Sequence, residues 1–396
     1  MENTIRDLDV KGKKVFLRVD FNVPLKEGRV ADDTKIRAAL PTISYLLEGG
    51  AALIVASHLG RPKGQVKEEL RMDPVARALE GHLGRKVKKT EAFSGEPLKK
   101  EADALKPGEV LLVENIRFHP GEEKNDPDFS RELASLADYF VNDAFATAHR
   151  AHASTVGVGE YLPAAAGFLM EKELQYLLGV LKDPQRPLVA IVGGAKVADK
   201  IELLKNLLAR VDTLLIGGGM ANTFLKASGF DLGASLLEED KVALARELIA
   251  LAREKGIPLV LPKDLVAAKE LKEGQETQVV PADGLPRGYM ALDIGPKTVE
   301  DFAGYIQKAG TVIWNGPLGA FEVAPFDRGT AAVAREVAAS PAVSIIGGGD
   351  VVAAIHKAGL GEQMTHISTG GGATLELLEG RELPGVAVIT GGGGKK

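Results

Sequence analysis

The sequence contains no cysteine, which excludes a disulfide-stabilised scaffold and a zinc site built on thiolates. It has no excess of positive charge either: the formal net charge is −5, so no overall basic field is available to hold a nucleic acid. No apolar run approaches the roughly 18 residues of a membrane-spanning helix, and the first residues lack the apolar centre of a signal peptide. We therefore expect a cytoplasmic protein without nucleic-acid or membrane partners.

What the sequence does contain is enough apolar material for a large core. Of its 396 residues, 45% are hydrophobic and 26% are charged, which excludes a disordered chain. At about 150 residues per domain, this length predicts two or three domains.

The first half of the chain carries short apolar runs that end in polar residues, with helical patterns between them. The runs cover 15–20, 52–58, 110–115 and 139–143, and the helical patterns cover 37–47 and 130–137. Continuous apolar strands that alternate with helices are typical of a buried parallel sheet. The second half repeats this signal at 188–192, 213–216, 311–314, 343–346 and 366–369, but each of these runs leads into glycines.

A helix over 167–182 is predicted between the halves, with one apolar face formed by Leu174, Leu177, Leu178 and Leu181. Pro184 and Pro187 follow it, and proline cannot continue a helix. The predicted fold class is therefore α/β, with two domains that are each a parallel β-sheet flanked by helices, joined by a helix and a hinge. The predicted boundaries are 1–167, 168–187 for the connection, and 188–380.

Ligands of a parallel α/β sheet bind beyond the carboxyl ends of its strands, so the residues that follow each run matter most. In the first half these are polar or cationic, and Arg37 follows a polar loop; the set is Asp20, Asn22, Arg37, His58, Arg61, Arg117 and Arg150. Arginine presents a fork that matches carboxylate and phosphate oxygens, so the set predicts an anion site. For any single arginine a surface ion pair is the better interpretation, but not for the whole set.

In the second half the glycines stand where strands lead into helices. Glycine lets the backbone approach a phosphate, and the next helix offers unpaired N–H groups, so we expect a nucleotide phosphate site. Simple turn glycines are the alternative. Neither G-x-x-x-x-G-K-[ST] nor G-x-G-x-x-G is present. Lys196 and Lys200 would share a face if their segment is helical, and Asp350 is either a Mg²⁺ ligand or a helix N-cap.

The sequence contains no pattern typical of zinc catalysis or of a serine nucleophile. His149 and His152 have no partners at zinc spacing, and no Gly-x-Ser-x-Gly element is present. Two sites for anions on two separate sheets favour phosphoryl transfer, which needs positioning and charge neutralisation more than covalent chemistry.

Several segments together resemble the phosphoglycerate kinase family. They are RVDFNVP at 18–24, SHLGRP at 57–62, ENIRFH at 114–119, NDAFATAHRAH at 142–152, GGAKVADK at 193–200, WNGP at 314–317, GGGD at 347–350 and STGGG at 368–372. The resemblance covers almost the whole chain in the expected order. It implies a monomeric kinase that interconverts 1,3-bisphosphoglycerate and ADP with 3-phosphoglycerate and ATP, with Mg²⁺.

The resemblance also implies roles for individual residues. The seven residues of the anion set would hold the phosphoglycerate. The nucleotide would be held by Lys196, Lys200, Ala291, Asn315, Glu322, Gly347, Gly348, Gly349, Asp350 and Val351. Asp350 would bind Mg²⁺, Arg37 and Lys200 would neutralise the transferring group, and Gly371 and Gly372 would lie near it. The segment 381–396 would return to the first domain.

Two positions depart from the family pattern. Val351 stands where a serine or threonine is common, so we expect a hydroxyl contact to phosphate to be lost, and Ala291 stands where a glycine is common. Two other functions stay open from the residues alone. One is a two-domain kinase acting on a sugar or another acid, and the other is a two-lobed solute-binding protein.

Overall fold

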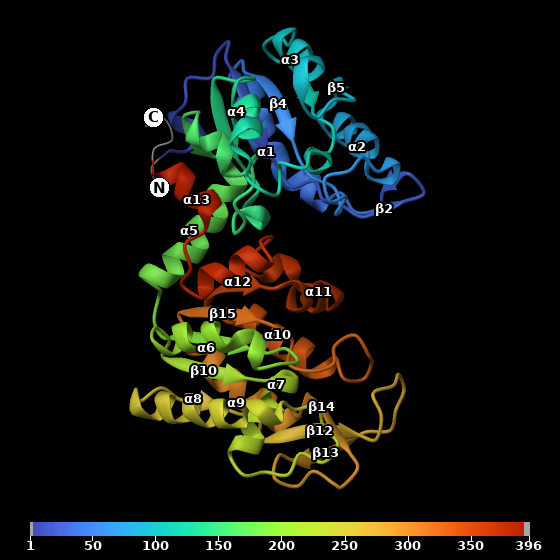
Figure 1. Cartoon of the computed structure of the whole chain (residues 1–396). Helices are drawn as coiled ribbons and strands as arrows, with labels where there is room; N and C mark the ends of the chain where they lie inside the picture. The colour runs from blue at the N-terminus through green and yellow to red at the C-terminus, as the bar shows by residue number, and fades with distance from the viewer. Residues whose placement is uncertain (1–2, 392–396) are drawn as a thin grey trace. The chain divides into compact units, whose positions relative to one another are not determined.

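The computed structural model describes residues 3–391, and the chain divides into two compact units (Figure 1). The first unit runs to Gln175 and takes up the chain again at Glu382, whereas the second runs from Tyr176 to Arg381. Helix α5 (Phe168–Lys182) contains the point where the chain passes from one unit to the other. The end of the tail, 392–396, lies outside the described residues.

The first unit is built on a six-stranded parallel sheet in the order β5-β6-β4-β1-β7-β8. Its strands are β1 (Lys14–Arg18), β4 (Ala52–Ala56), β5 (Val87–Lys89), β6 (Val110–Leu112), β7 (Tyr139–Asn142) and β8 (Ala164–Ala166). Alternate residues of β1 enter two different cores, because Val15 and Leu17 face one side and Phe16 faces the other. Helices α1 (Thr34–Glu48) and α2 (Asp73–Leu83) pack on the first side. Helices α3 (Gly95–Asp103) and α4 (Pro127–Ala134) pack on the second.

Two smaller elements complete this unit. Strands β2 (Leu25–Lys26) and β3 (Arg29–Val30) form an antiparallel ribbon. The last helix, α13 (Pro384–Thr390), packs against the first unit far from its neighbours in sequence. The amide of Gly385 donates to the carbonyl of Ala148 at 2.8 Å, and Asn142 Nδ2 donates to the carbonyl of Gly385 at 3.3 Å.

The second unit repeats the architecture with strands in the order β11-β10-β9-β15-β16-β17. These strands are β9 (Leu188–Val192), β10 (Thr213–Ile216), β11 (Leu259–Val260), β15 (Thr311–Asn315), β16 (Val343–Gly347) and β17 (His366–Ile367). Its helices are α6 (Ile201–Leu208), α7 (Gly218–Ala227), α8 (Val242–Glu254), α9 (Pro296–Ile306), α10 (Arg328–Ala339), α11 (Gly349–Lys357) and α12 (Gly372–Leu378). A second sheet, β13-β12-β14, consists of β12 (Asp264–Ala268), β13 (Gln278–Pro281) and β14 (Met290–Ile294).

The predicted fold class is confirmed, because both main sheets are parallel and flanked by helices. Three details of the prediction were wrong. The antiparallel sheet of β12, β13 and β14 was not foreseen. The helix predicted over 130–137 ends at Ala134. Leu178 is 42% exposed, so the buried face of α5 is formed instead by Met170, Leu174, Leu177 and Val180.

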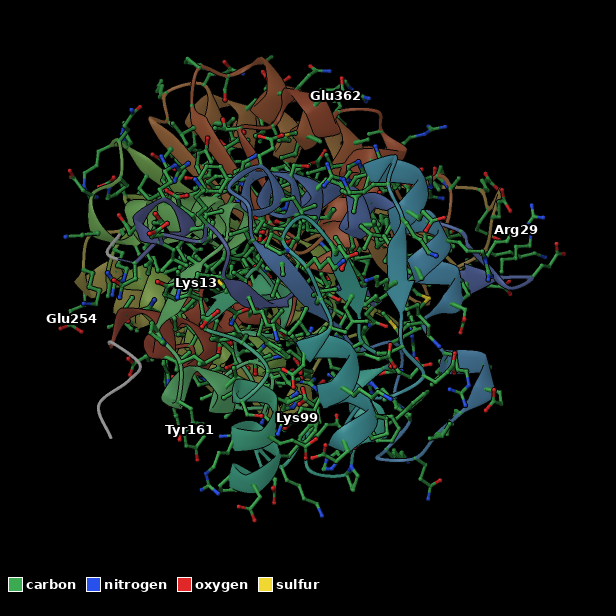
Figure 2. All side chains as sticks on the ribbon, turned by 90° about the horizontal axis from the view of Figure 1, so that it is seen from above. Lys13, Arg29, Lys99, Tyr161, Glu254 and Glu362 are labelled. Atoms are coloured by element: carbon green, nitrogen blue, oxygen red, sulfur yellow. The ribbon has the colours of Figure 1, made fainter. Side chains whose placement is uncertain are left out.

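Charge is spread over the surface in both signs. Figure 2 labels exposed side chains of both signs, among them Lys13, Arg29, Lys99, Glu254 and Glu362. Among the described residues, no helix combines the length and the apolar character needed to cross a bilayer.

Candidate active site

The cationic residues of the first unit gather at one edge of its sheet. Strands β6, β4, β1 and β7 are neighbours and run parallel, so their carboxyl ends meet there. His58 follows β4, Arg117 lies in the short turn after β6, and Arg150 lies beyond β7. We call this set of strand ends the cationic edge.

Arg18, at the end of β1, contacts His58 of the cationic edge from inside the first unit. The sequence analysis did not assign Arg18 a role. Its side chain is fully buried, and its Nε donates to Ser154 Oγ at 2.8 Å. Ser154 Oγ in turn donates to Glu122 Oε1 at 2.5 Å, so a buried hydroxyl joins a cation to a buried carboxylate. Arg18 Nη2 lies 3.2 Å from His58 Nδ1 and fixes that ring. Burial lowers the pKa of Arg18 to about 10, which leaves it charged at neutral pH.

His58 and His152 are neutral at pH 7. Burial holds the pKa of His58 well below its usual range, and the charges of Arg18 and Arg117 lower it further. Burial also lowers the pKa of His152 to about 4, with Arg117 adding to the effect. The positive charge offered to a ligand here therefore comes from arginine and lysine, while His58 acts as a neutral hydrogen-bonding group.

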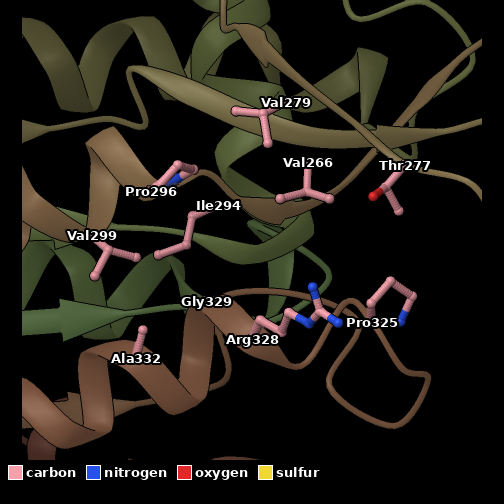
Figure 3. A pocket seen from close by; sticks show the side chains of 10 residues that line it. All are labelled: Val266, Thr277, Val279, Ile294, Pro296, Val299, Pro325, Arg328, Gly329 and Ala332. Atoms are coloured by element: carbon pink, nitrogen blue, oxygen red, sulfur yellow. The ribbon is translucent and has the colours of Figure 1, made fainter.

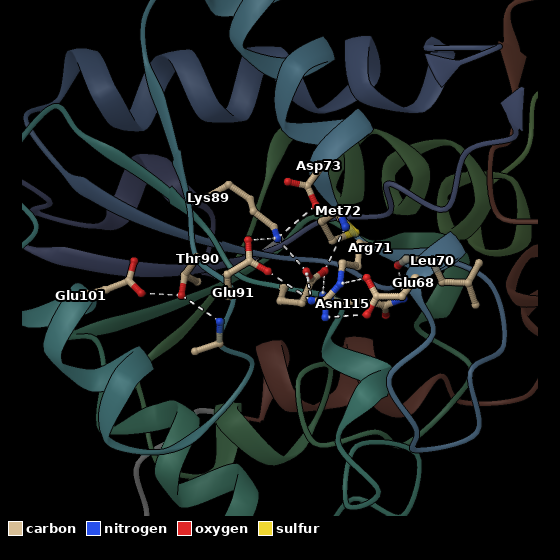
Figure 4. A network of polar contacts seen from close by, with 12 residues as sticks. Glu68, Leu70, Arg71, Met72, Asp73, Lys89, Thr90, Glu91, Glu101 and Asn115 are labelled. Atoms are coloured by element: carbon tan, nitrogen blue, oxygen red, sulfur yellow. Dashed lines mark hydrogen bonds and ion pairs between the residues drawn. The ribbon is translucent and has the colours of Figure 1, made fainter. Parts of the chain in front are cut away.

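A polar network around the buried Glu114 includes Asn115 (Figure 4), which holds the backbone of Arg117, and the guanidinium of Arg117 donates to the carbonyl of Gly60 at 3.1 Å. Glu114 accepts hydrogen bonds from the amides of Met72 and Asn115, and its Oε2 pairs with Lys89 Nζ at 2.7 Å. Asn115 Oδ1 accepts from the amide of Arg117 at 3.2 Å. The Nε of Arg117 is buried and has no hydrogen-bond partner, although Glu123 Oε1 lies 3.7 Å away. A rigidly held guanidinium with an unused donor suits an anion.

The remaining predicted residues of the first unit are less tightly grouped. Asn22 Oδ1 accepts from the amide of Gly60 at 2.9 Å, which ties the β1 loop to the loop that carries Arg61. Asp20 pairs with Lys35 at 2.8 Å, so Lys35 joins the edge without having been predicted. Arg150 donates from Nε to His149 Nε2 at 3.3 Å.

Arg37 does not point into the cationic edge in this structure. It lies in the first turn of α1, its side chain is 59% exposed, and its Nε donates to Asp33 Oδ1 at 2.9 Å. The same carboxylate accepts from His82, which together with Arg37 lowers the pKa of Asp33. Arg61 is exposed as well. The structure thus brings Asp20, His58 and Arg117 together around Arg18, with Arg150 near Arg117, but it does not bring Arg37 there.

In the second unit, backbone groups rather than side chains form the edge of the sheet. The amide of Gly193 donates to Asn315 O and that of Gly194 to Pro317 O, both at 2.9 Å. A Cβ on Gly193 would lie 2.1 Å from Pro317 O, so the loops after β9 and β15 can approach this closely only at a glycine. We call these junctions the glycine edge.

Lys200 lies at the glycine edge, where Asn315 links it to the ends of two strands. Its Nζ donates to Asn315 Oδ1, and Asn315 Nδ2 donates to the carbonyl of Gly347 at 2.7 Å. Burial lowers the pKa of Lys200, whereas the charges of Asp199 and Asp350 oppose that shift. A partly desolvated ammonium group beside helix N-termini is a strong phosphate ligand.

Helices α11 and α12 both begin at this edge after glycines with positive φ. Gly348, at φ 108°, precedes α11, and Gly371, at φ 50°, precedes α12. Gly347, Gly349 and Gly372 belong to the same two junctions. Asp350 lies in the first turn of α11 and is exposed, so the alternative of an Asp350 N-cap was wrong.

Two further predictions about this unit need correction. Lys196 precedes the first helical turn of this segment, the 3-10 helix η6 (Ala198–Lys200), and α6 begins only at Ile201, so Lys196 and Lys200 do not share a helical face. Lys196 is exposed. Val351 is fully buried in the apolar core of the unit, so its side chain does not face the edge at all. A hydroxyl in this rotamer would meet the core, not a phosphate.

The last two predicted residues lie at the border of this unit's smaller sheet and its loops. Ala291 is on β14, and its amide donates to Ser235 Oγ at 2.8 Å. Glu322 is exposed in the turn after Phe321, whose carbonyl accepts from Lys357 Nζ at 3.1 Å.

The donor set at the glycine edge is suited to magnesium bound together with phosphate. Asp350 supplies one exposed carboxylate near Lys200, and Mg²⁺ is usually held by one or two carboxylates, water and phosphate oxygens. Within residues 3–391 no group of three histidines, aspartates or glutamates could hold a metal by itself.

Known proteins resemble this chain over its whole length. The phosphoglycerate kinase family profile matches residues 5–381. A phosphoglycerate kinase of Moorella thermoacetica is 62% identical over 387 residues, covering 98% of both chains. One from Pelotomaculum thermopropionicum is 58% identical over 388 residues, covering 98% of this chain and 99% of the relative.

Solved structures of phosphoglycerate kinases have the same fold as this chain. A phosphoglycerate kinase from Coxiella burnetii superposes with a TM-score of 0.92 at 44% identity, covering 98% of each chain. The crystal structure of the enzyme from Pyrococcus horikoshii OT3 gives a TM-score of 0.84 at 36% identity, again with 98% of each chain covered.

Proposed function

Because this chain belongs to the phosphoglycerate kinase family, whose members transfer a phosphoryl group reversibly in glycolysis, we propose that its two edges hold the two reactants of that transfer. The cationic edge would bind 3-phosphoglycerate or 1,3-bisphosphoglycerate, and the glycine edge would bind ADP or ATP with Mg²⁺. The observation that supports this assignment is the separation of two ligand chemistries on two sheets. One edge offers charged side chains, and the other offers backbone N–H groups with one lysine.

For the acid, the proposal assigns the phosphate and carboxylate contacts to the anion set named above. Arg117 has a rigid guanidinium with an unused donor, and His58 is neutral and fixed by Arg18. Asn22 is joined to the same loop as Arg61. Arg37 would reach the ligand only after it leaves Asp33, which is reasonable because an exposed ion pair stabilises its geometry only weakly.

For the nucleotide, the proposal assigns phosphate contacts to Lys200, Asn315 and the N-termini of α11 and α12. Asp350 would bind Mg²⁺, which neutralises phosphate charge when bound. Ala291 and Glu322 would contact the base and ribose. Lys196 is exposed in this structure and would need to turn toward the phosphates.

The proposed mechanism needs no general base. In the direction that consumes ATP, the acceptor would be the carboxyl group of 3-phosphoglycerate. A carboxylic acid of this kind has a pKa of about 3.5 and is ionised at pH 7. The barrier therefore lies in bringing anions together, and the residues that lower it are donors already oriented toward the developing charge. We assign that role to Lys200 and to Arg37, which would take it only after leaving Asp33, with the amides of Gly371 and Gly372 beside the transferring group.

The two edges belong to different units, so we propose that transfer follows a hinge motion about α5 and its ends. Closure of this kind excludes water and aligns the reactants. Small-angle scattering should show a smaller radius of gyration with both substrates than with either alone. An unchanged radius would contradict the hinge while leaving the reaction untouched.

A coupled assay tests the function directly. We expect ATP to form from 1,3-bisphosphoglycerate and ADP only when Mg²⁺ is present, and we expect a panel of sugars and acetate to be inactive with ATP. Phosphorylation of a sugar would favour the alternative kinase, which the comparisons do not favour. We also propose that the protein is a cytoplasmic monomer. Light scattering after size-exclusion chromatography tests its oligomeric state.

A further inference from the structure

A cavity of about 320 Å³ opens in the second unit at a place to which the proposed reaction assigns no role. Its walls come from all three strands of the smaller sheet and from the first turns of α9 and α10. Figure 3 shows Val266, Val279, Ile294, Val299 and Ala332 around it, with Arg328 at one side. This volume lies at the lower end of the roughly 300–1,000 Å³ typical of small-molecule sites.

The cavity and the predicted base contact Ala291 lie on opposite faces of that sheet. Val266 and Val279 are cross-strand partners, so both point to the cavity side. Leu265, next to Val266, belongs to the apolar cluster of the other side. Ala291 packs against that same cluster, although the pairing of β12 with β14 has a register shift between Val266 and Ala267. A ligand of the cavity would therefore not occupy the nucleotide site.

The lining combines branched aliphatic walls with one exposed cation, Arg328, whose side chain makes no hydrogen bond or ion pair among the described residues. None of the lining residues is aromatic. Figure 3 shows the Arg328 side chain extending from the start of α10 toward Pro325 and the side of Val266. Within residues 3–391, neither the guanidinium of Arg328 nor the hydroxyl of Thr277 on the same wall has a hydrogen bond or an ion pair.

The one carboxyl group next to the lining that could oppose an anion is engaged elsewhere. Asp293 contacts the backbone of Gly329, and its two oxygens accept from the amides of Gly329 at 2.7 Å and Ile294 at 2.9 Å. Burial raises the pKa of Asp293 well above its usual range. Asp327 precedes Arg328 in the chain and its charge reaches both Arg328 and Asp293, but it is paired with Lys357 at 2.9 Å. Arg328 therefore dominates the charge that a ligand meets.

We propose that this cavity binds a medium-chain aliphatic monocarboxylate. The chain would lie against Val266, Ile294 and Val299, and the carboxylate would pair with Arg328, with Thr277 as a further donor. A planar guanidinium matches the two oxygens of a carboxylate. The aliphatic walls favour a flexible alkyl chain, because no ring is present to stack on an aromatic ligand.

Titration of the full chain with octanoate, octylammonium and acetate tests the ligand class, with binding followed by calorimetry and saturation-transfer NMR. We expect octanoate to bind at one site, and octylammonium and acetate to bind at least about tenfold more weakly, since each lacks either the charge or the chain. Equal binding of octylammonium would overturn the role of Arg328. Equal binding of acetate, or no binding of octanoate, would overturn the proposal.

Matched variants locate the site. Arg328→Gln should weaken octanoate binding at least about tenfold, while Arg335→Gln, an exposed arginine on the same helix, should leave it unchanged. Ala332→Leu should fill the cavity and weaken binding without loss of turnover. Equal affinities for the two arginine variants, or displacement of octanoate by saturating MgATP, would place the ligand elsewhere and contradict the inference.

Discussion

The edges of the two parallel sheets offer different groups to an anion although both sheets are flanked by helices in the same way. The first unit uses charged side chains held by buried partners, as Arg18, Ser154 and Glu122 show beneath His58. The second unit uses the backbone, where loops approach so closely at Gly193 that no side chain fits, and adds Lys200. A sheet edge can thus present positive potential either through desolvated cations or through amides.

The difference carries a physical lesson about cost. A buried cation needs a buried counter-charge, so the polar groups that support the cationic edge, such as Arg18 and Glu122, lie inside the first unit. Backbone amides need only glycines and helix starts, so the core of the second unit remains apolar around Trp314. Removal of a buried charge should therefore damage the first unit broadly, while damage to the second should come from sterics or from the loss of one lysine.

The largest effect is expected from Arg18→Met. The change leaves the Glu122 carboxylate buried without its cation, which should lower the free energy of unfolding by about 3–5 kcal/mol. Trp314 is the only tryptophan and lies in the second unit, so its fluorescence reports the unfolding of that unit. The urea midpoint measured by its fluorescence should therefore fall less than the midpoint measured by circular dichroism, which reports both units. Arg131→Met, at a side chain 62% exposed, is the control. If adding Glu122→Gln to Arg18→Met restores no stability, the buried pair is not the cause.

Lys200→Ala should lower kcat about a hundredfold or more, equivalent to about 3 kcal/mol, because it removes a donor aimed at the transferring charge. Unfolding should change little, since Asn315 keeps its bond to the carbonyl of Gly347. Lys205→Ala, at an exposed side chain of α6, is the matched control. Near-native turnover of Lys200→Ala would exclude the assigned role and weaken the contrast between the edges.

Gly193→Ala tests the backbone half of the comparison. The new Cβ would lie 2.1 Å from Pro317 O, a backbone atom that cannot rotate aside as a side chain can, so we expect a loss of about 2–3 kcal/mol in the free energy of unfolding. The change should shift the fluorescence transition of Trp314 more than the circular dichroism, which is the reverse of Arg18→Met. Gly304→Ala in α9 meets nothing within 4 Å and should stabilise by about 0.5–1 kcal/mol. Tolerance of alanine at 193 would show that the two loops can separate freely.

A fourth prediction concerns pH and Asp143, whose Oδ1 accepts from the amides of Leu169 and Met170 at the start of α5. Burial raises its pKa to about 6 from 3.8. The folded state thus binds the proton more tightly than the unfolded state. The resulting stability is complete below pH 3.8 and is lost as pH rises through 6.

For this group the loss between pH 5 and pH 8 should be about 1.5 kcal/mol. Asp143→Asn removes the titrating group. The variant's free energy of unfolding minus that of the wild type should therefore rise by that amount between pH 5 and pH 8. Urea denaturation at the two pH values measures the difference, with Asp128→Asn, whose side chain is 91% exposed, as control. Parallel pH profiles for the wild type and Asp143→Asn would contradict the raised pKa.

Strand ends were predictable from the sequence because apolar runs mark buried parallel strands, and their carboxyl ends meet by topology. The placement of His58 and Arg117 at one edge follows from that rule. Side-chain direction was not predictable. Arg18 stands inside a strand whose alternation alone does not reveal a counter-charge on Glu122, more than a hundred residues away. Arg37 has Asp33 one helical turn away, and sequence spacing cannot weigh that pair against an anion.

The smallest effect is expected from Val351→Thr, which installs the residue type common in the family. The phase of α11 after Gly348 turns position 351 into the core, where Val351 is fully buried beside Ile346 and Ile355. A hydroxyl there lacks water, so unfolding should become easier by about 1 kcal/mol. The KM for MgATP should stay unchanged, because the side chain does not face the glycine edge. A lower KM would mean that the threonine turns outward to a phosphate, and side chains would then assist the backbone in the second unit as they do in the first.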